Sequence, residues 1–115
     1  MMITLPGIAP EMIANNLEPF EPTHPGEIIQ DELDARGLTQ TKLASQIGIP
    51  VSLLNEIIKG KRDVTIEYAL LLEVALGIEA DFWINMQTAF NKHRVRHDNA
   101  FMKRLADIRR MVAAL

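Results

Sequence analysis

The chain has 115 residues, no cysteine and a formal net charge of −3, and 48% of its residues are hydrophobic. This composition suits one compact domain with an added arm or helix, and it excludes disulfides and cysteine-ligated metal sites. No apolar run approaches the ~20 residues that span a bilayer, and the first residues lack the basic region of a secretory signal. We therefore expect a cytoplasmic protein with no membrane partner.

The charge is distributed unevenly along the chain. Residues 1–38 contain seven acidic residues and one basic residue, whereas residues 39–115 contain eleven basic and eight acidic residues. Such asymmetry indicates either two surfaces with different partners or an acidic part that is only a solvated face. The composition alone leaves both interpretations open.

The first elements along the chain are an arm and a helix. Residues 1–23 contain four prolines, which predict an irregular N-terminal arm with one short helix at about 11–17. The next helix is expected to begin at Pro25, which suits the first helical position, and to stop at Gly37. His24 precedes this helix, and we interpret it as a cap or turn residue.

Two short helices are predicted next, joined by a tight turn. Thr39 is expected to cap the first of them and Gly48 to end it. Pro50 starts the second, whose apolar residues recur at helical spacing as far as Gly60. A helix pair joined by a glycine-containing turn is how many small proteins present one helix to the DNA major groove.

Three more helices are expected in the second half of the chain. Thr65 caps a helix that Gly77 ends, Asp81 caps the next, and Asp98 caps the last. The last helix carries an apolar stripe with heptad spacing, but over only about two heptads. Its residues are Phe101, Leu105, Ile108, Val112 and Leu115. Because no segment alternates with a period of two, the predicted fold class is all-α.

The outward side chains of the second helix of the pair have the chemistry of base and phosphate contacts. Ser52 and Asn55 can donate and accept hydrogen bonds, Glu56 can accept one from a cytosine amino group, and Val51 can contact a thymine methyl. Gln40, at the start of the preceding helix, can hold a phosphate. The basic residues at the end of this helix and just after it (its exit) are Lys59, Lys61 and Arg62, and they are expected to contact phosphates. The full set of candidate DNA-binding residues is Gln40, Thr41, Val51, Ser52, Leu53, Asn55, Glu56, Lys59, Lys61 and Arg62. The alternative from residue chemistry is a plain helical hairpin with no DNA-binding role.

Five short motifs follow one another in order along the chain. They are His24-Pro-Gly-Glu, Gly37-Leu-Thr-Gln-Thr-Lys-Leu-Ala, Leu54-Asn-Glu-Ile-Ile-Lys-Gly-Lys-Arg, Ala69-Leu with Leu76-Gly, and Phe82-Trp-Ile-Asn-Met-Gln. Together they resemble the HigA-type antitoxins of the Xre (lambda-repressor-like) helix-turn-helix family. The resemblance covers about residues 23–95, and the ordered set is far more specific than any one motif.

This resemblance implies a fold and a function. The fold is a five-helix lambda-repressor-like helix-turn-helix domain at 24–97, preceded by the arm 1–23 and followed by an added amphipathic helix at 98–115. The function is that of a non-enzymatic antitoxin in a type II toxin–antitoxin module. Such a protein neutralises a HigB-like, RelE-family mRNA endonuclease toxin, and as a homodimer it represses its own operon by binding palindromic operator DNA.

The resemblance also assigns roles by motif position. Gln40 matches the phosphate-holding glutamine; the residues that match base-facing positions are Val51, Ser52 and Glu56. Lys59 matches a position that often contacts phosphate. The chain departs from the family at Pro50, where a Ser or Thr cap is usual, and at Val51, which is often polar or basic. These departures leave the operator sequence open.

Two further surfaces are expected from composition. The acidic residues of the first long helix form a candidate toxin-binding face: Glu27, Asp31, Glu32 and Asp34. A domain this small cannot easily bury all its large apolar residues, so some are expected to meet a second subunit. The candidate dimerisation residues are Phe82, Trp83, Met86, Phe90, Phe101, Leu105 and Ile108; the aromatic ones among them could also simply complete the core.

Other chemistries find little support in the sequence. His93 and His97 have metal-ligand spacing on a helix, but no carboxylate cluster or cysteine completes a site, and they are better interpreted as part of a basic helix end. We therefore expect no metal, no cofactor, no small-molecule substrate and no catalytic residues. Two alternative functions remain: a stand-alone Xre-type transcriptional regulator, or a protein-interaction module that has lost DNA binding.

Overall fold

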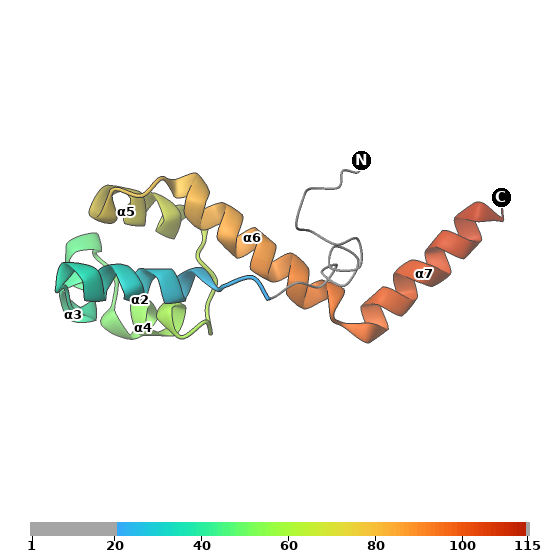
Figure 1. Cartoon of the computed structure of the whole chain (residues 1–115), viewed down its shortest axis with the longest axis horizontal. Coiled ribbons are helices and arrows are strands. Elements are labelled where there is room, and N and C mark those ends of the chain that lie inside the picture. Colours follow the sequence, from blue (N-terminus) through green and yellow to red (C-terminus); the bar gives the residue numbers. More distant parts are fainter. Residues whose placement is uncertain (1–20, 115) are drawn as a thin grey trace, which may run out of the picture.

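The computed structural model describes residues 21–114, which form six helices (Figure 1). They are α2 (Pro25–Arg36), α3 (Gln40–Ile47), α4 (Val51–Ile58), α5 (Ile66–Leu76), α6 (Ala80–Arg96) and α7 (Asn99–Ala113). No strand occurs among these residues, which confirms the all-α prediction. The expected helix at 11–17, and all but the end of the arm, lie outside the described residues. No described helix is long and apolar enough to cross a membrane.

The ends of most helices follow the local sequence signals. Three side chains accept a backbone N–H three residues further on, as predicted: Thr39, Thr65 and Asp98. Three helices end at a glycine in the left-handed conformation, with φ between 65° and 76°: Gly37, Gly48 and Gly77. His24 caps α2 through its imidazole, because Nδ1 accepts the Gly26 N–H at 2.9 Å. Pro50 occupies the N-cap position of α4 and makes no side-chain cap.

The start of α6 differs from the prediction that Asp81 caps it. The helix begins at Ala80, and Asp81 lies within its first turn. The Ala80 N–H is instead bonded to Glu73, whose Oε2 accepts it at 2.9 Å from the preceding helix. A carboxylate supplied by α5 therefore satisfies this helix end, and Asp81 contributes only a favourable charge at the positive end of the helix dipole.

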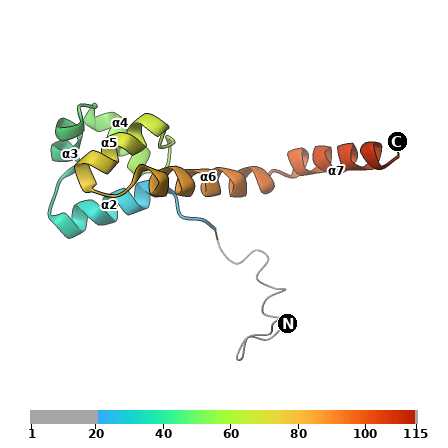
Figure 2. The same cartoon turned by 90° about the horizontal axis from the view of Figure 1, so that it is seen from above.

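One apolar face of each helix from α2 to α6 contributes to the core. The largest fully buried side chains are Ile29, Leu33, Leu43, Leu54, Ile57, Leu72 and Trp83. Figures 1 and 2 show α2–α5 gathered around the first half of α6, whereas α7 extends beyond the far end of α6. None of the residues of α7 is buried. The core thus fixes α3 and α4 in place, and α7 takes no part in it.

Candidate DNA-binding surface

The position of α4 is set by α2 through a close backbone contact. A Cβ added to Gly26 would lie 2.1 Å from the carbonyl oxygen of Ile57 and 2.7 Å from that of Ile58. Only glycine lets the first turn of α2 approach the last turn of α4 this closely. Leu54 and Ile57 anchor the inner face of α4 in the core. The outer face of α4 is therefore held in a fixed orientation.

The structure brings the candidate DNA-binding residues together on one side of the molecule. They come from the start of α3, from the outer face of α4 and from the segment that follows α4. None of the ten is buried, and Val51, at the beginning of α4, is 44% exposed. Lys59, Lys61 and Arg62 are all exposed at the exit. The arrangement offers a short mixed polar and apolar helix face with a basic end.

Three side-chain amides connect α2, α3 and α4 in a chain. Gln40 Nε2 donates to Gln30 Oε1 at 3.1 Å, and Asn55 Nδ2 donates to Gln40 Oε1 at 3.0 Å. One N–H of the Asn55 amide is therefore used to hold α4 against α3. Asn55 is less free to contact a base than its outward position on α4 suggested. Gln40 is held at the start of α3 through both its Nε2 and its Oε1. The sequence did not indicate the participation of Gln30, because the three residues lie far apart along the chain.

Glu56 is less repulsive to DNA than its charge implies. The Arg62 Nε and Nη2 both lie 2.9 Å from Glu56 Oε1, so a guanidinium sits beside the carboxylate. Both side chains are about half exposed, and exposed ion pairs of this kind contribute little to stability, typically 0.2–1 kcal/mol. The pair is therefore more important for local charge: it places a cation next to the carboxylate on the outer face of α4.

His24 is buried beneath the exit of α4. Its ring lies 3.6 Å from where a Cβ on Gly60 would be, and it meets Phe90 edge to face with ring centroids 4.9 Å apart. Because Nδ1 accepts a hydrogen bond, the neutral ring carries its proton on Nε2, which is buried and has no partner among the described residues. Burial lowers the pKa of His24 below 6.5; Arg94 also lowers it, and Asp63 partly offsets both.

This buried imidazole predicts an acid-sensitive fold. The lowered pKa means that the folded state disfavours the proton, so the contribution of His24 to stability is complete above about pH 6.5 and is lost as the pH falls below it. We expect His24→Asn to keep the cap, since Asn also accepts a backbone N–H, and to remove this dependence. Urea unfolding of both proteins between pH 7.5 and 5 measures it, with a slope of at most about 1.4 kcal/mol per pH unit. Equal slopes in the two proteins would contradict the prediction.

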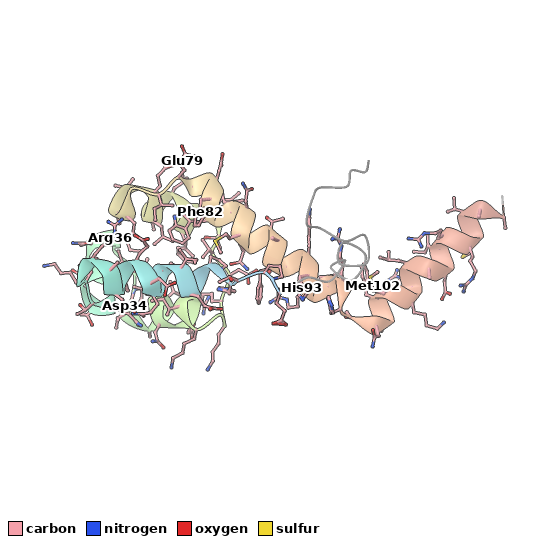
Figure 3. All side chains as sticks on the ribbon, viewed as in Figure 1. Asp34, Arg36, Glu79, Phe82, His93 and Met102 are labelled. Atoms are coloured by element: carbon pink, nitrogen blue, oxygen red, sulfur yellow. The ribbon has the colours of Figure 1, made fainter. Side chains whose placement is uncertain are left out.

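The acidic residues of α2 lie on the outside of the bundle. Glu27, Asp31 and Asp34 are exposed, whereas Glu32 is half-buried and pairs with Arg36 at 3.1 Å. Arg36 also donates to the carbonyl oxygen of Leu76 at 2.6 Å, which ties the end of α2 to the end of α5. Figure 3 shows Asp34 and Arg36 at this end of the molecule. Asp34 Oδ1 also accepts a hydrogen bond from Gln30 Nε2 at 2.8 Å, so this face carries four carboxylates of which Glu32 is paired with a cation.

The candidate dimerisation residues do not form one surface. Trp83 is fully buried in the core of a single chain, where its Nε1 donates to the carbonyl oxygen of Ile78 at 3.3 Å, so it is not available to a second subunit. Phe82 is 41% exposed beside it, whereas Phe90 packs against His24. Met86 is half-buried on α6. The remaining three residues, Phe101, Leu105 and Ile108, lie on α7, away from the core.

His93 and His97 lie at the end of α6 with ring centroids 4.0 Å apart, and the His97 Nδ1 is 2.9 Å from the carbonyl oxygen of His93. The Arg94 guanidinium lies over the Phe90 ring on the same helix, at 5.5 Å from its centroid. Among residues 21–114, no group of three potential ligands could hold a metal ion. The geometry is that of a basic helix end.

Comparison with known proteins places this surface in a family. Residues 29–83 match the HTH_3 helix-turn-helix family. Virulence-associated protein I of Dichelobacter nodosus is 38% identical over 76 residues, covering 65% of this chain and 70% of that protein. A HigA-family addiction module antidote protein from Coxiella burnetii is 30% identical with a TM-score of 0.65, covering 74% of this chain and 95% of that one. Pseudomonas aeruginosa antitoxin HigA, solved with the higBA promoter, is 27% identical with a TM-score of 0.66, covering 70% of this chain and 88% of that one.

The arrangement of α2–α6 and the exposed face of α4 define a helix-turn-helix DNA-binding protein with a lambda-repressor-like fold. The chain belongs to the HTH_3 family of Xre-type helix-turn-helix proteins, and it resembles the HigA-type antitoxins within that family. This is a family of antitoxins and transcription regulators and not of enzymes.

Proposed function

We propose that this protein is the antitoxin of a type II toxin–antitoxin module and represses its own operon. As a homodimer in the cytoplasm it binds palindromic operator DNA, with Gln40 and the basic exit of α4 on phosphates and the outer face of α4 in the major groove. The observation that carries this proposal is the similarity of 70–74% of this chain to HigA antitoxins, one of them solved with promoter DNA. In such a dimer, the two α4 helices (the reading helices) would lie one DNA turn (~34 Å) apart, which matches the two halves of a palindromic operator.

The toxin half of the proposal is tested by the neighbouring gene. We expect it to encode a basic protein of roughly 90–100 residues, a HigB-like mRNA endonuclease, that co-purifies with this chain and loses its toxicity in the complex. Operator binding without such a partner would instead support a stand-alone regulator. Toxin binding with no mobility shift on the upstream DNA would support a protein-interaction module.

We propose the acidic face of α2 as the docking surface for the toxin, because a protein that acts on ribosome-bound RNA is expected to be basic. Reversing the charges of Asp31, Glu32 and Asp34 together is expected to slow toxin association about tenfold at low salt, since rim charges act mainly on the association rate. Surface plasmon resonance at two salt concentrations measures this. An unchanged association rate at low salt would reject this surface.

A further inference from the structure

The helix α7 has an apolar face that the described chain covers only in part, near Leu105, which is half-buried. Phe101, Leu105, Ile108 and Val112 recur at steps of four, three and four and therefore lie along one side of the helix. The exposed fractions of Phe101, Ile108 and Val112 are 38%, 45% and 62%. A single helix of 15 residues is only marginally stable in water, and helices in proteins gain most of their stability from packing. The stripe requires a partner.

The charges around this stripe define the chemistry of the partner. Arg104 and Arg109 flank the stripe on its two sides, because they lie about 70° to either side of its centre on the helix. The only carboxylate within α7, Asp107, lies on the opposite face, where it pairs with Lys103 at 3.5 Å and with Arg110. The stripe therefore fits an apolar surface edged with carboxylates.

The elbow between α6 and α7 extends this surface. A groove of about 570 Å³ lies there, with apolar side chains that include Val95 and Leu105. Its charged lining residues are Lys92, Arg96 and Arg109, and none of the described residues that line it carries a carboxylate. Pairing of α7 with α7 of a second copy would place the flanking arginines against each other in either orientation, which disfavours that arrangement.

The complementary surface is on α5. Ile66, Leu70 and Val74 are spaced four residues apart and are 64%, 50% and 86% exposed, so they form a second uncovered apolar stripe. Glu67 flanks it on one side and is exposed; Glu73 flanks it on the other side, is half-buried and also accepts the Ala80 N–H through Oε2. Val74 also lines a shallow groove of about 410 Å³ between α3 and α5, which offers room for an inserted side chain. This stripe has glutamates where the stripe of α7 has arginines.

The two stripes cannot meet within one chain. The helix α5 packs against the beginning of α6, and α7 follows the end of α6, which is about 25 Å long. Figures 1 and 2 both show α5 and α7 at opposite ends of α6, and Figure 3 places Glu79, just after α5, far from Met102 on α7. Among residues 21–114, the α5 stripe can therefore meet the α7 stripe only in a second copy of the chain.

We propose that α7 of each copy docks on α5 of a second copy, arginine edge against glutamate edge. A two-fold axis then gives two identical contacts and closes the assembly as a dimer. This inference rests on the homodimer of the proposed function and names the surfaces that form it.

Charge reversal tests the interface. R104E/R109E is expected to raise the dimer dissociation constant about 100-fold, because it places four carboxylates together at each contact. K103E/R110E, an equal change of charge on the opposite face of α7, is the control and should leave the dimer intact. Sedimentation velocity of the full chain measures both, and circular dichroism confirms that α7 remains helical.

A charge swap identifies the partner surface. E67K/V74K changes two residues that are exposed on α5, so the fold should tolerate it, and it should also weaken the dimer. Mixed with R104E/R109E, it should restore a heterodimer, since each α7 then meets an α5 of opposite charge. If R104E/R109E instead forms a heterodimer with the unaltered chain that is tighter than the unaltered homodimer, α7 pairs with α7 and the proposal is wrong.

The remaining outcomes separate this inference from the proposed function. If the unaltered chain is a dimer that binds its operator and R104E/R109E dimerises equally well, the interface is rejected and the proposed function stands. If the unaltered chain is a monomer, both the interface and the proposed operator-binding dimer are rejected.

Discussion

Reversal of two charges directly after α4, in the variant K61E/R62E, is expected to remove the operator shift at wild-type working concentrations in a mobility-shift assay. Both side chains are exposed directly after the reading helix, and a dimer carries each of them twice. Phosphate contacts supply most of the affinity of small DNA-binding proteins, and each one contributes about one unit to the slope of log affinity against log salt. The affinity at physiological salt should fall about 100-fold or more, and the residual salt slope should be shallower by about four.

This effect should come from lost phosphate contacts and not from unfolding. Among the described residues, Arg62 forms an ion pair with Glu56 in an exposed segment, and losing such a pair costs about 1 kcal/mol at most. The variant K103E/R110E carries the same change of charge on α7 and should bind the operator almost as well as the unaltered chain. A salt slope near zero for the unaltered chain would refute phosphate-dominated binding.

Local signals predicted the helices well. The caps at Thr39, Thr65 and Asp98 depend on hydrogen bonds to residues three positions away, so the sequence contains all the information they require. The start of α6 could not be predicted in this way. Its first N–H is satisfied by Glu73, and only the packing of α5 against α6 brings that carboxylate within reach.

The sequence predicted which positions of the candidate site are exposed, but not the hydrogen bonds between their side chains. The exposed positions of α4 follow from helical periodicity, because Leu54 and Ile57 face the core. The pairing of Asn55 with Gln40, and of Gln40 with Gln30, depends on how three helices meet. The family motifs identified Gln40 as a phosphate contact, but not the amide chain that holds it.

Burial was the property that the sequence specified least. Trp83 and Phe82 are adjacent aromatic residues at the start of α6, and the sequence left open whether they complete the core or meet a second subunit. The helix turns by 100° per residue, so Trp83 faces the core and is fully buried while Phe82 is 41% exposed. An aromatic stripe indicates that a helix face packs against something. It does not indicate whether that face packs against the same chain or against a second subunit.

Gly26→Ala is expected to destabilise the fold by about 3 kcal/mol or more. The added methyl group would lie 2.1 Å from the carbonyl oxygen of Ile57 and 2.8 Å from the Cα of Ile58. All the nearest atoms belong to the backbone of α4, which cannot give way as a flexible side chain would. A domain of this size has a total stability of about 5–15 kcal/mol, so the loss is a large share of it.

The matched control separates this clash from the general cost of replacing a glycine. Gly37→Ala meets no atom within 4 Å, but its φ of 65° is left-handed, so it should cost about 1 kcal/mol through backbone strain alone. Urea unfolding of the two variants measures the difference. Because the contact at Gly26 fixes the position of α4, Gly26→Ala should also weaken operator binding. At equal concentrations of folded protein, the Gly26→Ala variant should bind the operator more weakly than the Gly37→Ala variant. Equal losses of stability in the two variants would show that α2 and α4 are not in the close contact that positions the reading helix.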